Sequence, residues 1–203
     1  MIEYHYDDHV STITINRPEK ANALTSAMLR ELIDAVEKSR GSRVTILTGI
    51  GKVFSAGAAL EEVQSGLATD PAWEILSQAV ADQKGLTICA LNGTLAGGAF
   101  GMALACDIRV AVPDARFFYP VMKMGVYPQP SDTKRMEDLI GPSRTKMVLL
   151  TARKIDAETA LRWGLIDDIV APDDLIHRAH ELAAPAKAAS LDLVGGIKDM
   201  IKR

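Results

Sequence analysis

Apolar residues follow two different periods along the first part of the chain. From Ile2 to Tyr6 and from Val10 to Ile15 they alternate with polar residues, and the segment 7–9 separates the two runs. A period of two is typical of strands, so these runs predict an antiparallel hairpin. Apolar residues then recur at helical spacing from Leu24 to Val36, which predicts a helix with Thr25 as its N-cap.

Short apolar, β-branched runs alternate with helical segments through most of the remaining chain. Strands are expected at 44–48, 87–91, 108–112 and 165–170, with a short extended piece at 117–118. Helices are expected at 70–84, 132–140, 143–151, 157–163, 172–184 and 188–202, and a proline-rich irregular segment at 119–131. Strands that alternate with helices pair in parallel through crossover helices. The pattern therefore predicts an α/β fold.

Composition narrows the class of protein further. The chain has 203 residues, of which 48% are hydrophobic and 24% charged, so it is long enough for one domain with a sizeable core. Its formal net charge of −3 offers no cationic surface for nucleic acid. The first residues lack a secretory signal, no apolar run approaches the ~20 residues of a membrane helix, and the chain has two cysteines, Cys89 and Cys106. We therefore expect a cytoplasmic protein that binds neither membranes nor nucleic acid.

Two turns built of small residues are the first candidates for chemistry. One runs from Val53 to Ala59 and the other covers 96–98, and each leaves a strand and enters a helix. Where no Cβ stands in the way, such turns present free backbone amides, and two amides that converge on one point form an oxyanion hole. A dinucleotide site would need a glycine at Ala96, ahead of Gly98 and Gly101. The oxyanion hole is therefore the better interpretation, and an NAD-dependent oxidoreductase is the weaker one.

Several motifs carry a resemblance to a known family. FSAGAAL, ALNGTLAGGAFGMALACDIRVA, ARFFYPVMKMGVYP and LLTARKIDAETALRWGLID follow one another in this order, and NRPEKANAL precedes them. Together they resemble the enoyl-CoA hydratase/isomerase, or crotonase, family over residues 10–184. The resemblance implies a single domain of repeated ββα units, the ClpP/crotonase spiral, over 1–203, with a core to about residue 140. It also implies a helical oligomerisation region at about 141–203 and a homotrimer or hexamer.

The same resemblance implies a ligand and part of its site. Family members take coenzyme A thioesters as substrates, and two amides hold the thioester oxygen; here these would be the amides of Ala58 and Gly98. We expect no permanently bound cofactor, and no metal either, because His177 and His180 stand at helical spacing without a carboxylate pattern such as HExxH. Asp107 matches a structural residue of the family. Two segments would contact the coenzyme: the loop from Arg17 to Ala23, and Ser55 with Ala56. Arg17 and Lys20 would face the coenzyme's phosphates, although solvated surface charge explains these two cations equally well. The residues expected there are Arg17, Lys20, Ala21, Ser55 and Ala56.

Two positions depart from the family pattern. Hydratases of the family use two glutamates, and the resemblance places Gly101 and Val121 at those positions. Neither side chain can move a proton, whereas a general acid or base contributes about 10²–10⁴-fold to a rate. We therefore expect a poor hydratase, and decarboxylation, isomerisation or hydrolysis fits the sequence better.

Three other side chains are candidates for proton transfer, each with a plainer alternative. Glu61 lies where decarboxylases of the family carry a functional histidine, but we favour the interpretation that it is a solvated glutamate on an exposed helix. Tyr127 lies one residue from the tyrosine of the same branch and fits core packing. Asp132 can act as an acid or base, although we favour the interpretation that it caps a helix together with the preceding serine. Tyr119 and Gln129 lie beside it without an assigned role.

Two functions of different classes follow. One is an acyl-CoA enzyme of fatty acid metabolism that stabilises a thioester enolate. The other is a catalytically silent acyl-CoA carrier or sensor that has kept the oxyanion hole. A polar side chain within hydrogen-bond reach of the substrate's α-carbon favours the enzyme, whereas a wholly apolar pocket favours the carrier.

Overall fold

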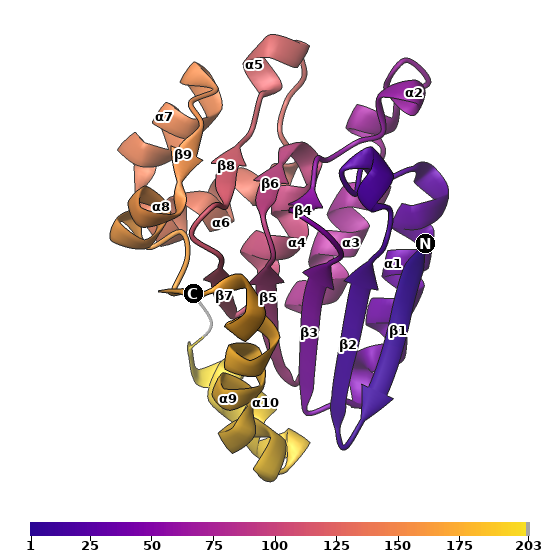
Figure 1. Cartoon of the computed structure of the whole chain (residues 1–203), viewed down its shortest axis with the longest axis vertical. Helices are drawn as coiled ribbons and strands as arrows, with labels where there is room; N and C mark the ends of the chain where they lie inside the picture. Colours follow the sequence, from indigo (N-terminus) through magenta and orange to yellow (C-terminus); the bar gives the residue numbers. More distant parts are fainter. Residues whose placement is uncertain (202–203) are drawn as a thin grey trace.

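The computed structural model describes residues 1–201 and contains two β-sheets flanked by helices (Figure 1). The larger sheet has six strands in the order β1-β2-β3-β5-β7-β10. The hairpin of β1 with β2 is antiparallel, as the period of two predicts, and the other neighbours pair in parallel. The strands are β1 Ile2–Asp7, β2 Val10–Ile15, β3 Val44–Gly49, β5 Leu86–Leu91, β7 Ile108–Ala111 and β10 Asp168–Ile169.

The smaller sheet has four strands in the order β4-β6-β8-β9, and two of them lead into the small-residue turns. β4, β6 and β8 are parallel, whereas β9 is antiparallel to β8. The strands are β4 Val53–Ser55, β6 Thr94–Ala96, β8 Arg116–Phe118 and β9 Ile155–Asp156. Because β4 and β6 run in the same direction, the turns that follow them lie at the same edge of the sheet.

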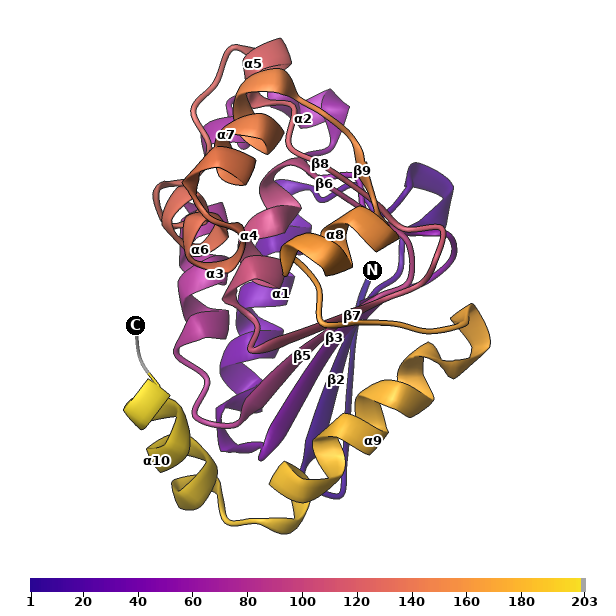
Figure 2. The ribbon, with the colours of Figure 1, turned by 90° about the vertical axis from the view of Figure 1, so that its left-hand side faces the viewer.

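Helices cover both faces of the larger sheet. Figure 2 shows α1, α3 and α4 on one face and α9 on the other. The helices are α1 Ser26–Lys38, α2 Leu60–Val63, α3 Ala72–Ala81, α4 Phe100–Ala105, α5 Val121–Met124, α6 Pro130–Ile140, α7 Pro142–Thr151, α8 Ala157–Trp163, α9 Leu175–Ala188 and α10 Leu191–Ile201. Short 3₁₀ turns occur at η1 Pro18–Lys20, η2 Ser39–Gly41, η3 Leu67–Thr69, η4 Gly97–Ala99 and η5 Pro172–Asp174. Within residues 1–201, none of the helices combines the length and the apolar character needed to cross a bilayer.

The predicted α/β class and most expected elements are confirmed. Thr25 caps α1, since its side chain accepts a hydrogen bond from Met28 N at 3.2 Å. Two expectations are wrong in detail. The segment 119–131 is not irregular throughout, because it contains α5 and the start of α6. The strand expected at 165–170 is reduced to β10, since the Leu165 carbonyl accepts a hydrogen bond from Arg109 Nε at 2.9 Å instead of joining the sheet.

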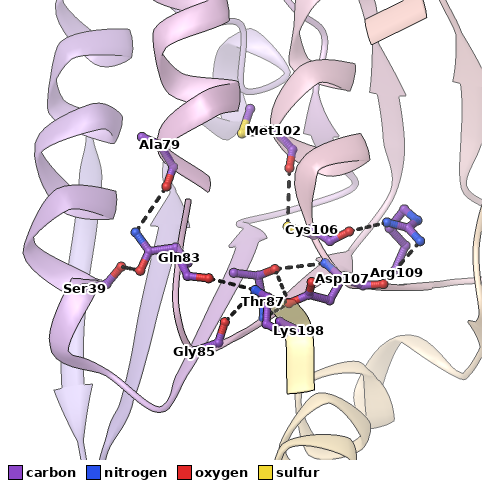
Figure 3. A network of polar contacts seen from close by, with 10 residues as sticks. All are labelled: Ser39, Ala79, Gln83, Gly85, Thr87, Met102, Cys106, Asp107, Arg109 and Lys198. Atoms are coloured by element: carbon purple, nitrogen blue, oxygen red, sulfur yellow. Dashed lines mark hydrogen bonds and ion pairs between the residues drawn. The ribbon is translucent and has the colours of Figure 1, made fainter. Parts of the chain in front are cut away.

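The C-terminal part of the chain is tied to the core through both sheets and a polar network. Its strands β9 and β10 pair with β8 and β7. On α10, Lys198 donates from Nζ to the carbonyls of Gln83 and Gly85 at 2.8 and 2.9 Å and forms an ion pair with Asp107 at 2.8 Å (Figure 3). Asp107 also accepts hydrogen bonds from Thr87 N and Oγ1, both at 2.8 Å. Asp107 therefore has the structural role that the sequence predicts. Lys202, the last residue of the helix expected at 188–202, lies outside the described residues.

Candidate active site

The two small-residue turns touch each other at the ends of β4 and β6. A Cβ built on Gly57 would lie 2.9 Å from the Ala96 carbonyl oxygen and 3.3 Å from the Gly97 Cα. Gly57 and Gly97 have φ angles of 88° and 57°, in the left-handed region that glycine adopts without steric cost. The two turns therefore meet through direct backbone contact, in a conformation that depends on glycine.

The backbone pairing at Ala58 directs its amide away from the neighbouring strand. Leu24 forms a parallel bridge with Ala58, in which Leu24 N donates to Gly57 O and Ala59 N donates to Leu24 O, both at 2.8 Å. In a parallel bridge of this kind, the central residue directs its own N–H to the opposite side. The amide of Ala58 is therefore not used by Leu24, and Ala58 lines the cavity beside the turns.

The amide of Gly98 belongs to the start of a helical segment. Gly98 is the second residue of η4, whose N-cap residue Ala96 makes no side-chain capping bond. The first amides of such a segment have no partner inside it. A Cβ on Gly98 would lie 2.9–3.1 Å from ring atoms of Trp73, which is 2% exposed and donates from Nε1 to Leu67 O at 2.7 Å. The indole therefore packs directly on the Gly98 backbone and requires glycine there.

A cavity of about 600 Å³ opens beside both turns. Ala56, Ala58, Gly97 and Gly98 line one side of it, and Figure 1 shows α2 and α5 projecting at this end of the molecule, beyond β4, β6 and β8. Most of the remaining wall is apolar, with contributions from Leu60, Val63, Trp73, Val121, Met124 and Val126. Tyr119, Tyr127 and Thr69 are the lining residues that carry a hydroxyl group. A second cavity, of about 670 Å³, lies beneath α10 and includes neither turn, so the first cavity is the candidate site.

Three of the residues expected to contact the coenzyme lie together beside the first turn. Ala56 N donates to Ala21 O at 3.0 Å, and Ser55 Oγ donates to Asn22 O at 2.8 Å. Ser55 also accepts a hydrogen bond from Gly57 N at 3.2 Å and is fully buried. The Ser55 hydroxyl therefore links the turn to the backbone at Asn22 and stabilises it, while Ala56 lines the cavity.

The two candidate cations differ in their surroundings. Arg17 donates to the Ala23 carbonyl at 3.0 Å and forms an ion pair with Glu61 at 2.8 Å, whereas Lys20 is exposed. The hydrogen bond from Arg17 lowers the pKa of the Glu61 carboxyl. Glu61 does not line the cavity, and its bond to Arg17 ties α2 to the segment that precedes α1. Tyr127 does line the cavity and is 91% exposed, so it lies at the entrance.

Asp132 is fully buried behind the wall of the cavity. Its Oδ2 accepts a hydrogen bond from the Tyr119 hydroxyl at 2.8 Å, and Tyr119 lines the cavity. Its Oδ1 has no hydrogen-bond partner within residues 1–201 and lies 2.9 Å from where a Cβ on Gly101 would be. A carboxyl group from α6 therefore fills the space beside Gly101 on α4.

The interpretation that Asp132 caps a helix is wrong. α6 begins at Pro130, with Gln129 as its N-cap and no side-chain capping bond. Proline is favoured at the first helical position, so the helix starts earlier than the sequence pattern indicated. The preceding Ser131 donates from Oγ to Glu74 Oε2 at 2.9 Å. Asp132 thus faces the interior in the first turn of the helix.

Burial shifts the ionisation of both partners in the Tyr119–Asp132 pair. Burial, with the nearby charge of Glu74, raises the pKa of the Asp132 carboxyl to about 7, although the hydrogen bond from Tyr119 and the charge of Arg135 oppose the shift. Burial and then the charge of Asp132 raise the pKa of the Tyr119 hydroxyl. A carboxyl group that titrates near neutral pH is suited to proton transfer.

The sheets and the paired turns define the class of this protein: it has the α/β crotonase fold, with two mixed sheets and C-terminal helices. Residues 6–203 match the family model described as enoyl-CoA hydratase/isomerase, and the chain belongs to this family. The family acts on CoA thioesters. The resemblance found in the sequence motifs is therefore confirmed at the level of the family and the fold.

Relatives of the chain carry the names of different reactions. A short-chain-enoyl-CoA hydratase of Clostridium acetobutylicum is 37% identical over an alignment of 183 positions, gaps included, that covers 86% of this chain and 70% of the relative. A 4-chlorobenzoyl coenzyme A dehalogenase of an Arthrobacter species is 33% identical over an alignment of 217 positions, gaps included, that covers 99% of this chain and 77% of the relative. The crystal structure of an enoyl-CoA hydratase from Bacillus anthracis superposes with a TM-score of 0.90 at 32% identity and covers 98% of this chain and 81% of that one. Similarity to relatives therefore does not select a reaction.

Sequence reasoning missed Trp73 and gave no role to Tyr119. An aromatic residue in the helix expected at 70–84 was visible, but its contact with Gly98 joins positions far apart in the chain. The bond between Tyr119 and Asp132 likewise depends on the true start of α6.

Proposed function

We propose that the chain is an enzyme that binds an acyl-CoA and stabilises the enolate of its thioester with the amides of Ala58 and Gly98. The main support is the contact between Gly57 and the Ala96–Gly97 backbone, beside a cavity that Ala58 and Gly98 both line. Membership in a family that acts on CoA thioesters supports the choice of ligand. The coenzyme A is part of the substrate, and the proposal includes no resident cofactor.

Each amide would donate to the thioester oxygen as that oxygen gains negative charge. Donors that are already in position need no reorganisation, and each contributes about 2.7–4 kcal/mol in a transition state of this type. The apolar wall would hold the acyl group and exclude water. Lys20, which is exposed near the first turn, is the cation that we assign to the coenzyme's phosphates, because the guanidinium of Arg17 is bonded to Glu61 and Ala23.

The proposed reaction is a decarboxylation or an isomerisation, which pass through this enolate, or a hydrolysis, in which the same amides would hold the oxyanion of the tetrahedral intermediate; it is not a hydration. Gly101 and Val121, at the positions of the hydratase glutamates, supply no acid or base, and Val121 is an apolar part of the cavity wall. Tyr119 and its carboxyl partner place a proton-transfer group at the wall, which favours an enzyme over a silent carrier. We also propose a homotrimer or hexamer, with residues 141–203 at the subunit contacts, in the cytoplasm.

Crotonyl-CoA is expected to bind without being hydrated at an ordinary rate. Since hydration would lack both glutamates, turnover should fall at least ~10²-fold below the 1–10³ s⁻¹ that is typical of enzymes. Loss of the enoyl thioester absorbance measures it, and displacement by free coenzyme A verifies that the site is occupied. Turnover at ordinary rates would show that the chain is a hydratase. A 2-carboxyacyl-CoA, a 3-enoyl-CoA and a saturated acyl-CoA, assayed for carbon dioxide, a conjugated double bond and a free thiol, separate the three proposed reactions.

A further inference from the structure

We infer that the Tyr119 hydroxyl transfers the proton at the substrate's α-carbon and that Asp132 positions this hydroxyl and exchanges the proton with it. The assignment rests on the proposed function, because an enolate that forms by loss of the α-proton needs a group that removes the proton, and every such enolate, including one left by loss of carbon dioxide, needs a group that returns a proton to the α-carbon. Tyr119 lines the same cavity as Ala58 and Gly98, and its hydroxyl donates to Asp132 Oδ2 at 2.8 Å.

The ring of Tyr119 is held firmly beside the second turn. It stacks on Phe100 with the ring centroids 5.4 Å apart and the planes 16° from parallel, and Phe100 begins α4 directly after η4. Tyr119 is 4% exposed, and Gln129 N donates to its hydroxyl at 3.5 Å. The hydroxyl therefore has a fixed position relative to the helix that carries the Gly98 amide.

Asp132 is a buried carboxyl group whose bonding is incomplete. Its Oδ1 has no hydrogen-bond partner within the described part of the chain, and such buried polar atoms are few in native proteins. The groups that face it are Tyr119 ahead of α5, Glu74 on α3 and Arg135 on α6. Arg135 donates to the Ser131 hydroxyl at 2.7 Å and to that of Ser77. Among residues 1–201, the hydroxyl of Tyr119 is the side-chain group bonded to this carboxyl, so a proton can pass directly between the two.

The proton-transfer step balances with groups of the chain and the substrate alone. The α-carbon–hydrogen bond breaks, its electron pair forms the enolate double bond, and the thioester oxygen takes the negative charge between the two amides. The proton passes to the Tyr119 oxygen while the proton of Tyr119 passes to Asp132 Oδ2, so that the carboxylate becomes a carboxylic acid. The reverse step returns a proton to carbon. An isomerase removes a proton from one carbon and returns a proton to another. A decarboxylase only returns a proton to the α-carbon, after carbon dioxide has left.

Exchange of the α-hydrogens of butyryl-CoA for deuterium in D₂O isolates this step from the overall reaction. The wild-type chain is expected to exchange them, as followed by NMR, and Tyr119→Phe is expected to slow the exchange by about 10²-fold or more with an unchanged Kd for butyryl-CoA. The phenylalanine keeps the ring that stacks on Phe100. Tyr6→Phe removes the hydroxyl of an exposed tyrosine on β1 and is the matched control, which should exchange as the wild type does.

The pH profile tests the role of Asp132 separately from any structural role. Since the pKa of Asp132 is about 7, the carboxylate that accepts the proton is depleted below that pH, and the wild-type exchange rate should rise with pH and level off above about 7. Asp132→Asn is expected to lower the rate and to remove this rise. The other groups that face Asp132, Glu74 and Arg135, are unchanged in the variant.

The outcomes separate this assignment from the proposed function. A wild-type chain that fails to bind butyryl-CoA overturns the proposed function itself. A chain that binds it without exchange does not remove the α-proton, and this overturns the assignment of that step to Tyr119 while leaving the proposed binding of acyl-CoA intact. If the wild type exchanges and Tyr119→Phe does so equally fast, Tyr119 is not that group; if Asp132→Asn keeps the wild-type pH profile, Asp132 takes no part. Should Tyr119→Phe not fold, the profile of Asp132→Asn decides the question.

Discussion

An ester in place of the amide of Ala58 or Gly98 is expected to slow enolate formation about 10²–10³-fold at each position. Lactic acid at position 58 and glycolic acid at position 98 keep the shape of the chain but remove the N–H that would donate to the thioester oxygen. The donor matters most when the oxygen is charged, so kcat should fall more than binding of the acyl-CoA weakens. The rate of α-hydrogen exchange with butyryl-CoA measures the loss.

The controls for this experiment lie in the same chain. Glycolic acid at Gly196, an exposed position on α10, removes a backbone N–H outside the cavity and should leave the exchange rate unchanged. Gly98→Ala tests the same turn with a different change, because its Cβ would overlap the Trp73 ring. A Cβ at Gly196 would meet no atom within 4 Å apart from its chain neighbours and the backbone of its own helix. If both esters exchange at the wild-type rate, the amides of Ala58 and Gly98 do not form an oxyanion hole.

Asp132→Asn is expected to change how the stability of the protein depends on pH. The folded-state pKa of Asp132 is raised from 3.8 to about 7 by burial, so the folded chain binds this proton more tightly than the unfolded chain does. The resulting stabilisation is complete below the unfolded pKa and is lost as the pH rises through about 7. At about 1.4 kcal/mol per pH unit, the wild type should lose on the order of 4 kcal/mol across this range relative to the variant.

Urea denaturation of both proteins from about pH 4 to pH 8 measures this difference. The free energies of unfolding of wild type and Asp132→Asn should diverge steadily up to about pH 7 and then remain parallel, with the variant the more stable at high pH. Asp114→Asn, at an exposed turn position, is the control and should follow the wild type. Parallel curves for Asp132→Asn over the whole range would mean that Asp132 is ionised throughout in the folded protein.

Much of the fold could be predicted because local patterns specify it. The alternation in β1 and β2 and the cap at Thr25 depend on neighbours in sequence. The two turns were recognisable because each places small residues between a strand and a helix. This sequence pattern is typical of sites at which backbone amides bind a ligand. The Gly57–Gly97 contact then follows from the parallel pairing of β4 with β6.

The polar half of the candidate site could not be predicted in the same way. Whether Asp132 caps α6 or faces the interior depends on where the helix starts, and Pro130 moves that start by two residues. The contacts of Trp73 with Gly98 and of Tyr119 with Asp132 depend on how α3, α4 and α6 pack, which no local pattern encodes. Glu61 was a candidate because of its place in the motif, yet its side chain is bonded to Arg17 away from the cavity.

The central proposal is that two backbone amides polarise the thioester carbonyl of a bound acyl-CoA. Isotope-edited infrared difference spectroscopy of butyryl-CoA labelled with ¹³C at this carbonyl measures the polarisation directly in the wild-type chain. Hydrogen bonds from the amides of Ala58 and Gly98 weaken the C=O bond, so the stretching band should move to lower wavenumber on binding and move back when either amide is replaced by an ester. A bound ligand whose carbonyl band stays at its position in water would contradict the proposal.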